Sequence, residues 1–597
     1  MNRAVPPARL CTIIPSITQM SKHSSLLLSA IVTSIFLSVA APALAKPSGT
    51  EIAQVPTQIA PVANPNLDRI PQPLPLPSPL PPKTPVLTPP TTLPPTTPDS
   101  NIDISVTRVE VSGSTVFKPE ELAKLTQRIE GKSVKLRDLQ AVADQITALY
   151  LDRGYITSRA ILGEQAIVNG LVKIQILEGS LESLEITGLK RLNKNYVESR
   201  IRLGIKKPLN KNQLEDQLQL LKSDALLESI EARLRPGSGT GQSILSLHVK
   251  ESKPIAGNVS IDNYSSPSVG SERFGGGLTY RNVTGLGDEL SVSYNRSFPG
   301  GSNAFDFSYR VPVNAMNGTV QLRVAPNNSK VIEKPFDSLD IFSTTELYEV
   351  SYRQPLIRTP REEFALSLAF AVQNGRTTIS GQPLNTTSSG TDIDGRGQTR
   401  ILKFGQDYLK RDIQGAWALR SQFSLGLNAF DATSGPEPNG QFLSWLGQVQ
   451  RVQRLGTNQL LIAQGDVQLA SDPLLPSQQF VISGGQSVRG YRQNLRSGDN
   501  GARFSLENRI ALQRNSVGSP TFQLAPFLDA GWVWNNSRNP ATFSNETFLA
   551  SVGLGVILEP LAGLVVRVDY GIPLVYNSDR RENAQDRGLN FSVGYSF

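Results

Sequence analysis

Phe591-Ser592-Val593-Gly594-Tyr595-Ser596-Phe597, the last stretch of the chain, alternates apolar residues with small or polar ones and stops at an aromatic residue. A period of two residues places the apolar side chains on one face of a β-strand and the others on the opposite face. Similar segments recur back to Gly257, among them Phe364–Phe370 and Val565–Tyr570, with turn-rich stretches between them. This texture predicts a mainly β fold for the C-terminal half of the chain.

The number and spacing of these segments favour a closed barrel. We count about 16 candidate strands of roughly ten residues, and an even number suits a closed antiparallel barrel in a membrane. In lipid every backbone N–H and C=O must pair internally, so such a sheet must close on itself. The mean hydropathy of −0.20 is compatible with this fold, because only alternate residues of a strand face lipid. We therefore predict a 16-stranded antiparallel transmembrane β-barrel over residues 253–597.

A different pattern precedes the barrel and occurs twice. Strand, helix, helix and two strands are expected in each copy, and the opening strand ends in a glycine, Gly113 in the first and Gly188 in the second. In the first copy a helix follows Pro119 and runs to about Ile129. In the second copy one helix is recognisable, around Leu214. The repeat predicts two small β-α-α-β-β domains, over residues 101–180 and 181–252.

The N-terminal residues look like a targeting segment followed by a spacer. An apolar run and the cleavage pattern Ala43-Leu44-Ala45 predict a signal peptide over residues 1–45, and a membrane anchor is the alternative. Residues 46–100 form a proline-rich linker. Because proline fixes φ and lacks an N–H, we expect this linker to form neither helix nor sheet and to be an extended spacer. It is either a tether through the periplasm or a passive tail.

Little in the chain suggests catalysis. The single cysteine, Cys11, lies in the expected leader, and there are two histidines, so thiolate and metal chemistry have few ligands. Gly131-Lys132-Ser133 resembles the end of a phosphate-binding loop, but Thr126 stands where its first glycine is needed. A net charge of +8 in 597 residues is mild, so nucleic-acid binding is not expected. We expect no enzyme activity, no cofactor and no metal.

Three motifs carry a resemblance to a known family. Gly154-Tyr155-Ile156-Thr157-Ser158-Arg159-Ala160 and Ile176-Leu177-Glu178-Gly179 resemble the end of the first POTRA domain in transporters of two-partner secretion. Val488-Arg489-Gly490-Tyr491 resembles the loop that folds inward in the BamA-type superfamily of POTRA-plus-barrel proteins, and Phe527-Leu528-Asp529-Ala530-Gly531 resembles its partner on the barrel wall. The chain thus resembles the ShlB/FhaC/HecB-type haemolysin secretion/activation proteins from about residue 102 to its end.

The resemblance implies a fold, a location and a function. The expected protein is an outer-membrane transporter of type V, two-partner secretion, with POTRA domains in the periplasm that hold a partially unfolded client. The client would be a large secreted β-helical protein, and the other contacts would be outer-membrane lipid and the barrel-insertion machinery. We expect a monomer. A barrel-insertion factor of the same superfamily and a passive diffusion porin are the alternatives, and POTRA domains that serve only as spacers remain open.

The resemblance also implies site residues. In the family the loop arginine meets an acidic residue on the inner wall, and Arg489 and Asp529 occupy these positions, with a guanidinium that can bind both carboxylate oxygens. Phe527, Asp529 and Gly531 share one face of their strand. The expected loop motif is Val488, Arg489, Gly490 and Tyr491, and the expected barrel signal is Phe591, Val593, Tyr595 and Phe597. Client-binding residues are expected somewhere within 101–252. Long polar loops, such as residues 377–398, are expected outside the cell.

Overall fold

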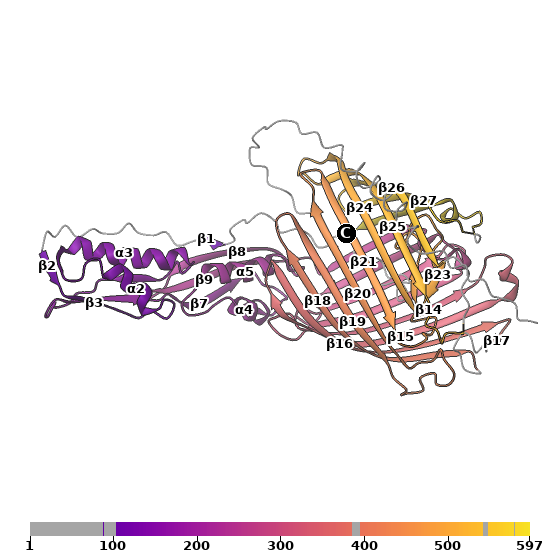
Figure 1. The fold of residues 1–597 in the computed structure, drawn as a ribbon, viewed down its shortest axis with the longest axis horizontal. Coiled ribbons are helices and arrows are strands. Elements are labelled where there is room, and N and C mark those ends of the chain that lie inside the picture. Colours follow the sequence, from indigo (N-terminus) through magenta and orange to yellow (C-terminus); the bar gives the residue numbers. More distant parts are fainter. Residues whose placement is uncertain (1–86, 89–102, 385–393, 541–546, 578–579) are drawn as a thin grey trace, which may run out of the picture. The chain divides into compact units, whose positions relative to one another are not determined.

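The computed structural model describes residues 87–88, 103–384, 394–540, 547–577 and 580–597 (Figure 1). The predicted signal peptide, residues 1–45, and all but two residues of the predicted linker lie outside the described residues. Among the helices that are described, none combines the length and the apolar character needed to cross a membrane.

The first small domain contains one strand pair more than predicted. Its elements are β2 (Asp103–Val106), β3 (Arg108–Ser112), α2 (Pro119–Thr126), β4 (Lys132–Lys135), α3 (Leu136–Asp152), β5 (Arg159–Ile161) and β6 (Leu171–Leu177). The order β3-β6-β5 forms the main sheet, and β2 pairs with β4 in a second, short sheet. Helix α2 ends at Thr126, so Ile129 lies beyond the helix that was expected to include it. The helices pack on the sheet through a core that includes Leu139, Ile146 and Ile174.

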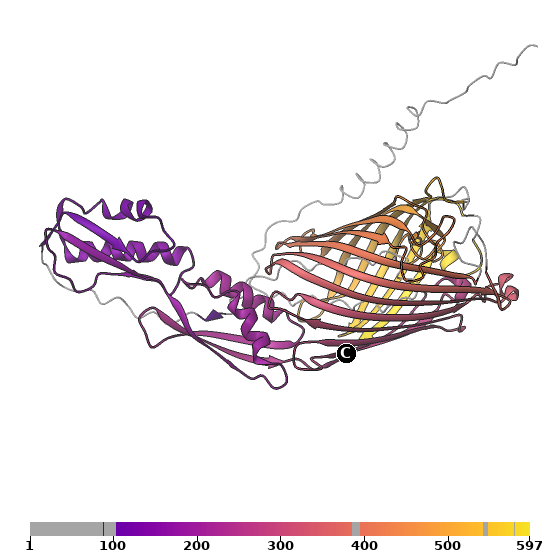
Figure 2. The ribbon, with the colours of Figure 1, turned by 90° about the horizontal axis from the view of Figure 1, so that it is seen from below.

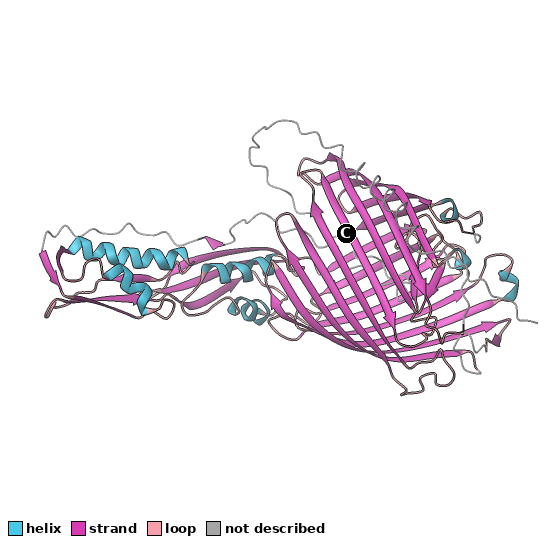
Figure 3. Cartoon of the chain, viewed as in Figure 1, coloured by secondary structure: helices cyan, strands magenta, loops and turns pink. Residues whose placement is uncertain are grey.

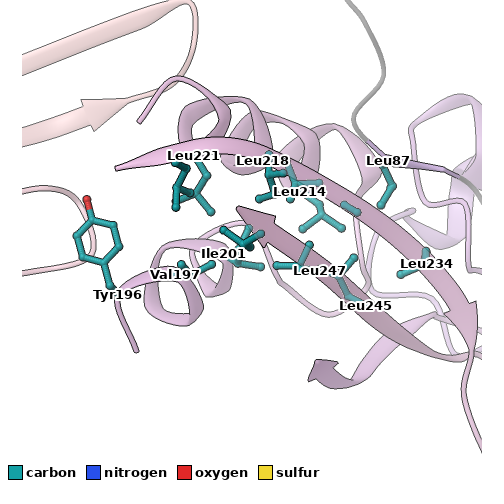
Figure 4. Close-up of a cluster of buried hydrophobic side chains, with 14 of the residues drawn as sticks. Leu87, Tyr196, Val197, Ile201, Leu214, Leu218, Leu221, Leu234, Leu245 and Leu247 are labelled. Carbon is teal, nitrogen blue, oxygen red and sulfur yellow. The ribbon is translucent and has the colours of Figure 1, made fainter. Parts of the chain in front are cut away.

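The second small domain has the predicted order of elements (Figure 3). They are β7 (Ser180–Thr187), α4 (Lys194–Arg202), α5 (Lys211–Lys222), β8 (Leu227–Pro236) and β9 (Gln242–Glu251). Helix α5 contains Leu214 and Leu218, as expected, whereas the sequence had not located α4. Figure 4 shows leucines of α5, β8 and β9 meeting in one apolar core.

Both small domains have a glycine with positive φ directly after their opening strand. Gly113 follows β3 with φ +90°, and Gly188 follows β7 with φ +91°. A Cβ at Gly113 would lie 2.4 Å from the carbonyl oxygen of Ile176, and one at Gly188 would lie 2.1 Å from that of Val249. Any other residue would collide with the central strand of its sheet, and its φ would be strained as well. The strand-then-glycine opening recognised in the sequence therefore has the same physical cause in both copies.

The expectation that the linker contains no sheet is wrong at one place. Leu87 and Thr88 form a short strand, β1, that pairs in parallel with Ala232 and Arg233 of β8. A proline has no N–H and cannot donate a main-chain hydrogen bond to a neighbouring strand, but Leu87 and Thr88 keep their N–H groups. Leu87 is 2% exposed and belongs to the core of the second domain. A leucine between prolines can therefore dock at a sheet edge although the linker as a whole is rich in proline.

Most of the remaining strands form a closed antiparallel barrel, as predicted (Figures 1 and 2). Sixteen strands run along its wall: β10 (Ile255–Asp262), β11 (Arg273–Arg281), β12 (Glu289–Ser297), β13 (Ser302–Pro312), β14 (Thr319–Lys330), β15 (Ile341–Arg358), β16 (Glu362–Ile379), β18 (Arg396–Arg411), β19 (Gly415–Gly426), β20 (Phe442–Arg454), β21 (Gln459–Ala470), β24 (Asn500–Arg514), β25 (Pro520–Trp534), β26 (Phe548–Leu561), β27 (Leu564–Pro573) and β28 (Leu589–Ser596). The two-residue β17 (Gln382–Pro383) pairs antiparallel with the end of β16.

The last strand closes the barrel on the first. β28 pairs with β10 in the register Asn258 with Ser596 and Asp262 with Ser592. The main chains of Gly257 and Phe597 exchange two further hydrogen bonds, at 3.0 and 2.9 Å. The terminal strand recognised in the sequence is thus the one that removes the edge of the sheet.

The two faces of the wall differ in chemistry. Large apolar side chains are exposed on the outer face, as at Val259, Ile261, Val593 and Tyr595. Charged residues are buried on the opposite face, for example Asp466, Arg503 and Asp529. An apolar exterior around a polar, buried interior is the arrangement that a barrel needs in lipid.

The turns at the two ends of the barrel differ in length. Short turns lie at the end where β10 begins, at residues 282–288, 313–318, 359–361, 412–414, 455–458, 515–519 and 562–563. Except for the four residues 298–301, longer segments lie at the opposite end, the longest being residues 471–499. The segment expected as a loop at 377–398 is shorter than predicted, because β16 continues to Ile379 and β18 begins at Arg396. The longest segment contains the loop motif.

Candidate functional site: a loop folded into the barrel

Residues 471–499, here called the inward loop, leave the long-turn end of the barrel between β21 and β24. The strands β22 (Phe480–Ile482) and β23 (Arg496–Gly498) pair antiparallel and form its stem. All three residues of β22 are buried. Val488, Arg489, Gly490 and Tyr491 lie at the turn between the two stem strands and are all buried as well. A hairpin with a buried tip cannot be a solvated surface loop.

Arg489 binds Asp529 of β25 directly. Its Nε lies 2.7 Å from Oδ2 and its Nη2 lies 2.9 Å from Oδ1, so the guanidinium binds both carboxylate oxygens. Its side chain is 7% exposed and that of Asp529 is 0% exposed. The ring of Phe527 lies beneath the guanidinium, with Cζ 3.5 Å from the ring centroid. Both the ion pair and the aromatic contact are strengthened by the exclusion of water.

Asp529 is held in place by its own neighbour as well. The hydroxyl of Ser505, on the adjacent strand β24, donates to its Oδ1 at 2.7 Å. Residues 505 and 529 are register partners, so strand pairing itself places the hydroxyl beside the carboxylate. The wall therefore presents a preformed acceptor to the loop arginine.

A second carboxylate, Glu507 of β24, completes the environment of Arg489. Nη1 of Arg489 lies 2.6 Å from Oε2 of Glu507, and Arg567 of β27 donates to the same oxygen at 2.6 Å. Arg509 donates to Oε1 at 2.7 Å, and Arg567 also donates to Asp569 at 2.7 Å. Three guanidinium groups thus face three carboxylates, Asp529, Glu507 and Asp569. Pairing and multiple hydrogen bonds of this kind offset the large desolvation penalty of the buried charges.

Gly490 lets the loop touch the wall. Its φ is +92°, and a Cβ on it would lie 3.0 Å from the carbonyl carbon and oxygen of Gly571 in β27. A Cβ on Gly571 would in turn lie 2.6 Å from the main-chain N of Gly490. Two glycines, one on each side, are therefore required for this close approach.

Tyr491 and Val488 anchor the tip on either side of the arginine. The hydroxyl of Tyr491 donates to the carbonyl oxygen of Ala550 at 2.7 Å and accepts from the N–H of Val575 at 3.2 Å. Val488 is fully buried and packs in a cluster with Tyr491, Ile482, Val533 and Leu549. The tip is thus fixed to β25, β26 and β27 by apolar packing as well as by charge.

Other contacts fix the flanks of the inward loop. Arg503 of β24 binds Asp466 of β21 at 2.7 Å and donates to the carbonyl oxygen of Gln486 at 2.8 Å. Arg492 makes a two-point contact with Asp586, at 2.9 and 2.6 Å. At the base, the fully buried Asp499 accepts from the N–H groups of Leu474 and Asn536. The loop is a packed part of the barrel interior over most of its length.

The residues singled out in the sequence fall into two groups in space. The structure brings the four loop residues together with Phe527, Asp529 and Gly531. The backbone of Gly531 lies so close to the loop that a Cβ added there would be 3.0 Å from Cγ2 of Val488. Phe591, Val593 and Tyr595 alternate along β28 and Phe597 follows its end; the last three are exposed. They mark the closing strand and are not part of the loop contact.

Sequence reasoning missed Glu507, Arg567 and Gly571. Glu507 and Arg567 lie in segments whose alternating pattern predicted strands, but nothing local shows that two strands far apart in sequence share a carboxylate. The available sign in the sequence was that both residues are charged, whereas most other inward-facing positions of their strands are small or polar. Within the described residues, no group of three or more histidine, cysteine, aspartate or glutamate side chains could hold a metal ion.

Two family models match the chain. A model described as haemolysin secretion/activation protein ShlB/FhaC/HecB matches residues 241–558, more than half of the chain. A model described as a ShlB-type POTRA domain matches residues 104–179, which contain most of the first small domain.

Individual proteins are similar over most of their length. The outer membrane transporter CdiB of Escherichia coli O6:K15:H31 (strain 536 / UPEC) is 26% identical over 486 residues, 79% of this chain and 79% of the relative. The heme/hemopexin transporter protein HuxB of Haemophilus influenzae (strain 86-028NP) is 24% identical over 483 residues, 78% of this chain and 82% of the relative. The solved structure of CdiB from Escherichia coli superposes with a TM-score of 0.64 at 22% identity, covering 86% of this chain and 94% of that one. This last likeness is one of fold.

Proposed function

The chain belongs to the family of haemolysin secretion/activation proteins ShlB/FhaC/HecB, and from this premise we propose that its client is a large, secreted β-helical protein that crosses the barrel partly unfolded. Members of this family are outer-membrane transporters of two-partner secretion, not enzymes, and this chain is a transporter of that kind, with its POTRA domains in the periplasm. We assign residues 101–180 and 181–252 to two POTRA domains and residues 253–597 to the barrel.

The POTRA domains are suited to holding an unfolded client. Each has a sheet with main-chain groups at an edge: β3 and β5 are the outer strands in the first domain, and β7 is an outer strand in the second, where β1 pairs with part of β8 on the other side. An extended segment can add to such an edge through main-chain hydrogen bonds, with little demand on its sequence. This mode of binding fits a client that has not yet folded.

The inward loop is the part of the barrel that we connect with transport. Val488, Arg489, Gly490 and Tyr491 place a hairpin against the inner wall, where Phe527, Asp529 and Gly531 receive it. A client and the loop would share the same enclosed interior. We propose that the contact between Arg489 and Asp529 holds the loop in the position from which a client can pass, and this buried ion pair is the observation that carries the proposal.

We propose further how export is driven, how the barrel is recognised for insertion and in which oligomeric state the transporter acts. Export needs no nucleotide, because a client that folds outside cannot slide back. The closing strand, with Phe591, Val593, Tyr595 and Phe597, is the signal through which the barrel-insertion machinery recognises the chain. The transporter acts as a monomer in outer-membrane lipid, and the proline-rich linker is a tether in the periplasm.

A deletion of residues 101–252 tests this function against its alternatives. The probe is the large exoprotein encoded next to the transporter gene, followed in the medium of cells that express both proteins. A transporter loses secretion of this protein on the deletion while the barrel still inserts, whereas a diffusion porin would keep its solute flux and have no client to lose. A barrel-insertion factor would instead reveal itself by a fall in many other outer-membrane proteins.

A further inference from the structure

A cavity lies at the long-turn end of the barrel, where β27 extends past β28. β27 continues to Pro573, beyond its last register pair with β28, Tyr570 with Leu589. The cavity has a volume of about 380 Å³ and is lined by this end of β27, by the tip of the inward loop and by described residues between β27 and β28. Sites for small organic groups begin at about this size.

One side of the cavity belongs to the lipid-facing surface. Tyr570 and Ile572 line it and are exposed in the outer row of β27, at 54% and 51%. Their register partners on β26, Leu554 and Val552, are exposed as well. An apolar strip two strands wide therefore runs along the outer wall up to the cavity, and acyl chains of a lipid can lie along it.

The other side of the cavity is cationic. Three arginines line it together with one carboxylate: Arg492, Arg580, Arg587 and Asp586. Asp586 is buried, and both of its oxygens already accept from Arg492, at 2.9 and 2.6 Å. Arg580 and Arg587 are exposed, and neither forms an ion pair with any residue that the structure describes. Two positive charges in the lining are thus not balanced by a carboxylate of the lining.

Arg587 lies beside the apolar strip. The carbonyl oxygen of Gly588, the next residue, accepts the main-chain N–H of Gly571 at 2.8 Å, which brings Arg587 to the end of the outer row of β27. A guanidinium group binds a phosphate or a carboxylate through two parallel hydrogen bonds. A ligand that satisfies this arrangement has an anionic group attached to an apolar part.

The cavity faces the outer leaflet of the membrane. β10 follows the second POTRA domain and begins at the short-turn end, so the long-turn end lies on the side away from the periplasm. Tyr576, which also lines the cavity, is 81% exposed, and tyrosines are typical of the boundary between hydrocarbon and headgroups. Basic clusters at that boundary bind anionic headgroups. The outer leaflet of an outer membrane consists mainly of glycolipids whose sugars carry phosphate or carboxylate groups.

We propose that this cavity binds the anionic headgroup of an outer-leaflet glycolipid, with Arg580 and Arg587 on its phosphate or carboxylate groups and its acyl chains along the apolar strip. Residues 490–492 form the inner side of the cavity, so the bound lipid contacts the inward loop directly after Arg489. A ligand that binds only the docked loop stabilises the docked state. The lipid therefore holds the inward loop against the wall, whatever the client is.

Lipid binding to the full-length protein in detergent micelles tests the proposal without requiring transport. The probe is deep-rough lipopolysaccharide, a glycolipid with phosphate and carboxylate groups, titrated and followed by native mass spectrometry. Arg580→Gln with Arg587→Gln should raise the Kd of the first bound lipid at least about tenfold, because hydrogen bonds to charged groups are lost at both positions. Both side chains are exposed, so the variant should still form a heat-modifiable barrel.

Arg376→Gln with Arg396→Gln is the matched control. These two exposed arginines are register partners on β16 and β18, at the same end of the barrel, and they do not line the cavity. The control removes the same charge and should leave the Kd at the wild-type value. Phosphatidylcholine, which has no net charge, should bind the wild type and the Arg580/Arg587 variant equally.

Hydrogen exchange shows whether the lipid holds the inward loop. At a lipid concentration about 100 times the Kd, exchange of the amides of residues 490–492 should slow by up to about a hundredfold in the wild type. The Arg580/Arg587 variant at the same lipid concentration should show a much smaller change.

Four results would overturn the proposal. Equal Kd values for the wild type and the Arg580/Arg587 variant would show that these arginines do not bind the headgroup, and an equal rise in the control would show a general attraction between charges. Unchanged exchange in residues 490–492 with lipid bound would show that the lipid does not hold the loop. Exoprotein binding that is lost in the variant, while lipopolysaccharide binding persists, would assign the cavity to the client.

Discussion

Arg489 and Asp529 are joined by three hydrogen bonds: two from the guanidinium and one, at 3.2 Å, from the main-chain N–H of Arg489. The carboxylate therefore fixes both the side chain and the backbone at the loop tip. Both residues are buried, so the contact lies where water is excluded.

Replacing Arg489 by alanine should detach the tip while the barrel still inserts. The change leaves Asp529 buried without its partner, and removing one member of a buried pair costs about 3–5 kcal/mol. A free-energy change of that size alters the equilibrium constant between the docked and the detached loop by more than about a hundredfold. Secretion of the exoprotein should be lost or severely reduced, while heat-modifiable migration in gels stays normal. Arg514→Ala, an exposed arginine on β24, is the control, and normal secretion by Arg489→Ala would refute a role for the tip.

A charge swap should recover less than a simple pair would suggest. Arg489→Asp with Asp529→Arg rebuilds one contact, but the new aspartate would face Glu507, which now binds Arg489 at 2.6 Å. Two carboxylates in the same enclosed space repel each other. Adding Glu507→Gln to the swap should therefore raise secretion above that of the swap alone. If the triple variant secretes no better than the double one, Glu507 does not act on the loop arginine.

Gly490→Ala should loosen the tip without changing any charge. The substitution combines a strained φ of +92° with a contact of 3.0 Å to Gly571, and strain of the first kind alone costs about 1–3 kcal/mol. External trypsin should then cleave after Arg489, which is buried in the wild type, or after Arg492, which is largely buried. Gly456→Ala is the matched control, because its φ is +83° and an added Cβ there meets nothing within 4 Å. Equal protection of both variants would contradict the close approach to Gly571.

Glu251 should make the second POTRA domain sensitive to acid. Its Oε1 accepts the N–H groups of Lys190, Arg191 and Leu192, at 2.6, 2.9 and 3.0 Å. Burial acts to raise its pKa, but these three donors outweigh burial and hold the pKa below its usual value of 4.5. A carboxyl group whose folded-state pKa is depressed stabilises the fold above its unfolded-state pKa. That contribution is lost as the pH falls through the folded-state pKa.

Hydrogen exchange checks this prediction on the full chain. At pH 7, Glu251→Gln should lower the protection of amides in residues 188–193 by about 1–2 kcal/mol, the difference between charged and neutral acceptors. The gap between variant and wild type should close as the pH falls below the folded-state pKa, after correction for intrinsic exchange rates. Glu228→Gln, at an exposed ion pair with Lys250, should change little at any pH. A gap that persists in acid would contradict the assignment.

Closure of the barrel between β10 and β28 should depend on the main chain of Phe597 more than on its aromatic ring. Deleting the residue removes both hydrogen bonds to Gly257, each worth about 0.5–1.5 kcal/mol, as well as the aromatic side chain. Phe597→Ala keeps both bonds. The yield of heat-modifiable barrel should therefore fall more for the deletion than for Phe597→Ala, and Phe597→Tyr should resemble the wild type. Equal yields from the deletion and Phe597→Ala would assign the effect to the ring alone.

The barrel and its loop contact could be predicted because their signals are local or paired. A period of two residues over Val565–Tyr570 is enough to specify a strand with one lipid-facing side. Arg489 and Asp529 stood within motifs whose spacing matched a family, and the structure places them in contact. The repeat was visible because a glycine with positive φ was needed twice, at Gly113 and Gly188.

What could not be predicted depends on contacts between distant strands or on the surroundings of a weak segment. Glu507 binds Arg567, sixty residues away, and only the barrel register brings them together. Leu87 sits among prolines, and only the small side chain of Ala232 makes room for it. Helix α4 was missed because its apolar residues, Tyr196, Val197 and Ile201, are few, although Asn193 caps it through its side chain.

The enclosed hairpin has a consequence for the order of assembly. Its tip contacts β24, β25, β26 and β27, whereas the barrel is closed by the pairing of β10 with β28, its first and last strands in chain order. The hairpin can already be packed on these four consecutive strands when the two ends of the sheet join, because none of these tip contacts involves β10 or β28. The bond between residues 489 and 529, only 40 positions apart, can form within the C-terminal third of the chain alone. The nascent wall would thus curl around its own hairpin before it is sealed.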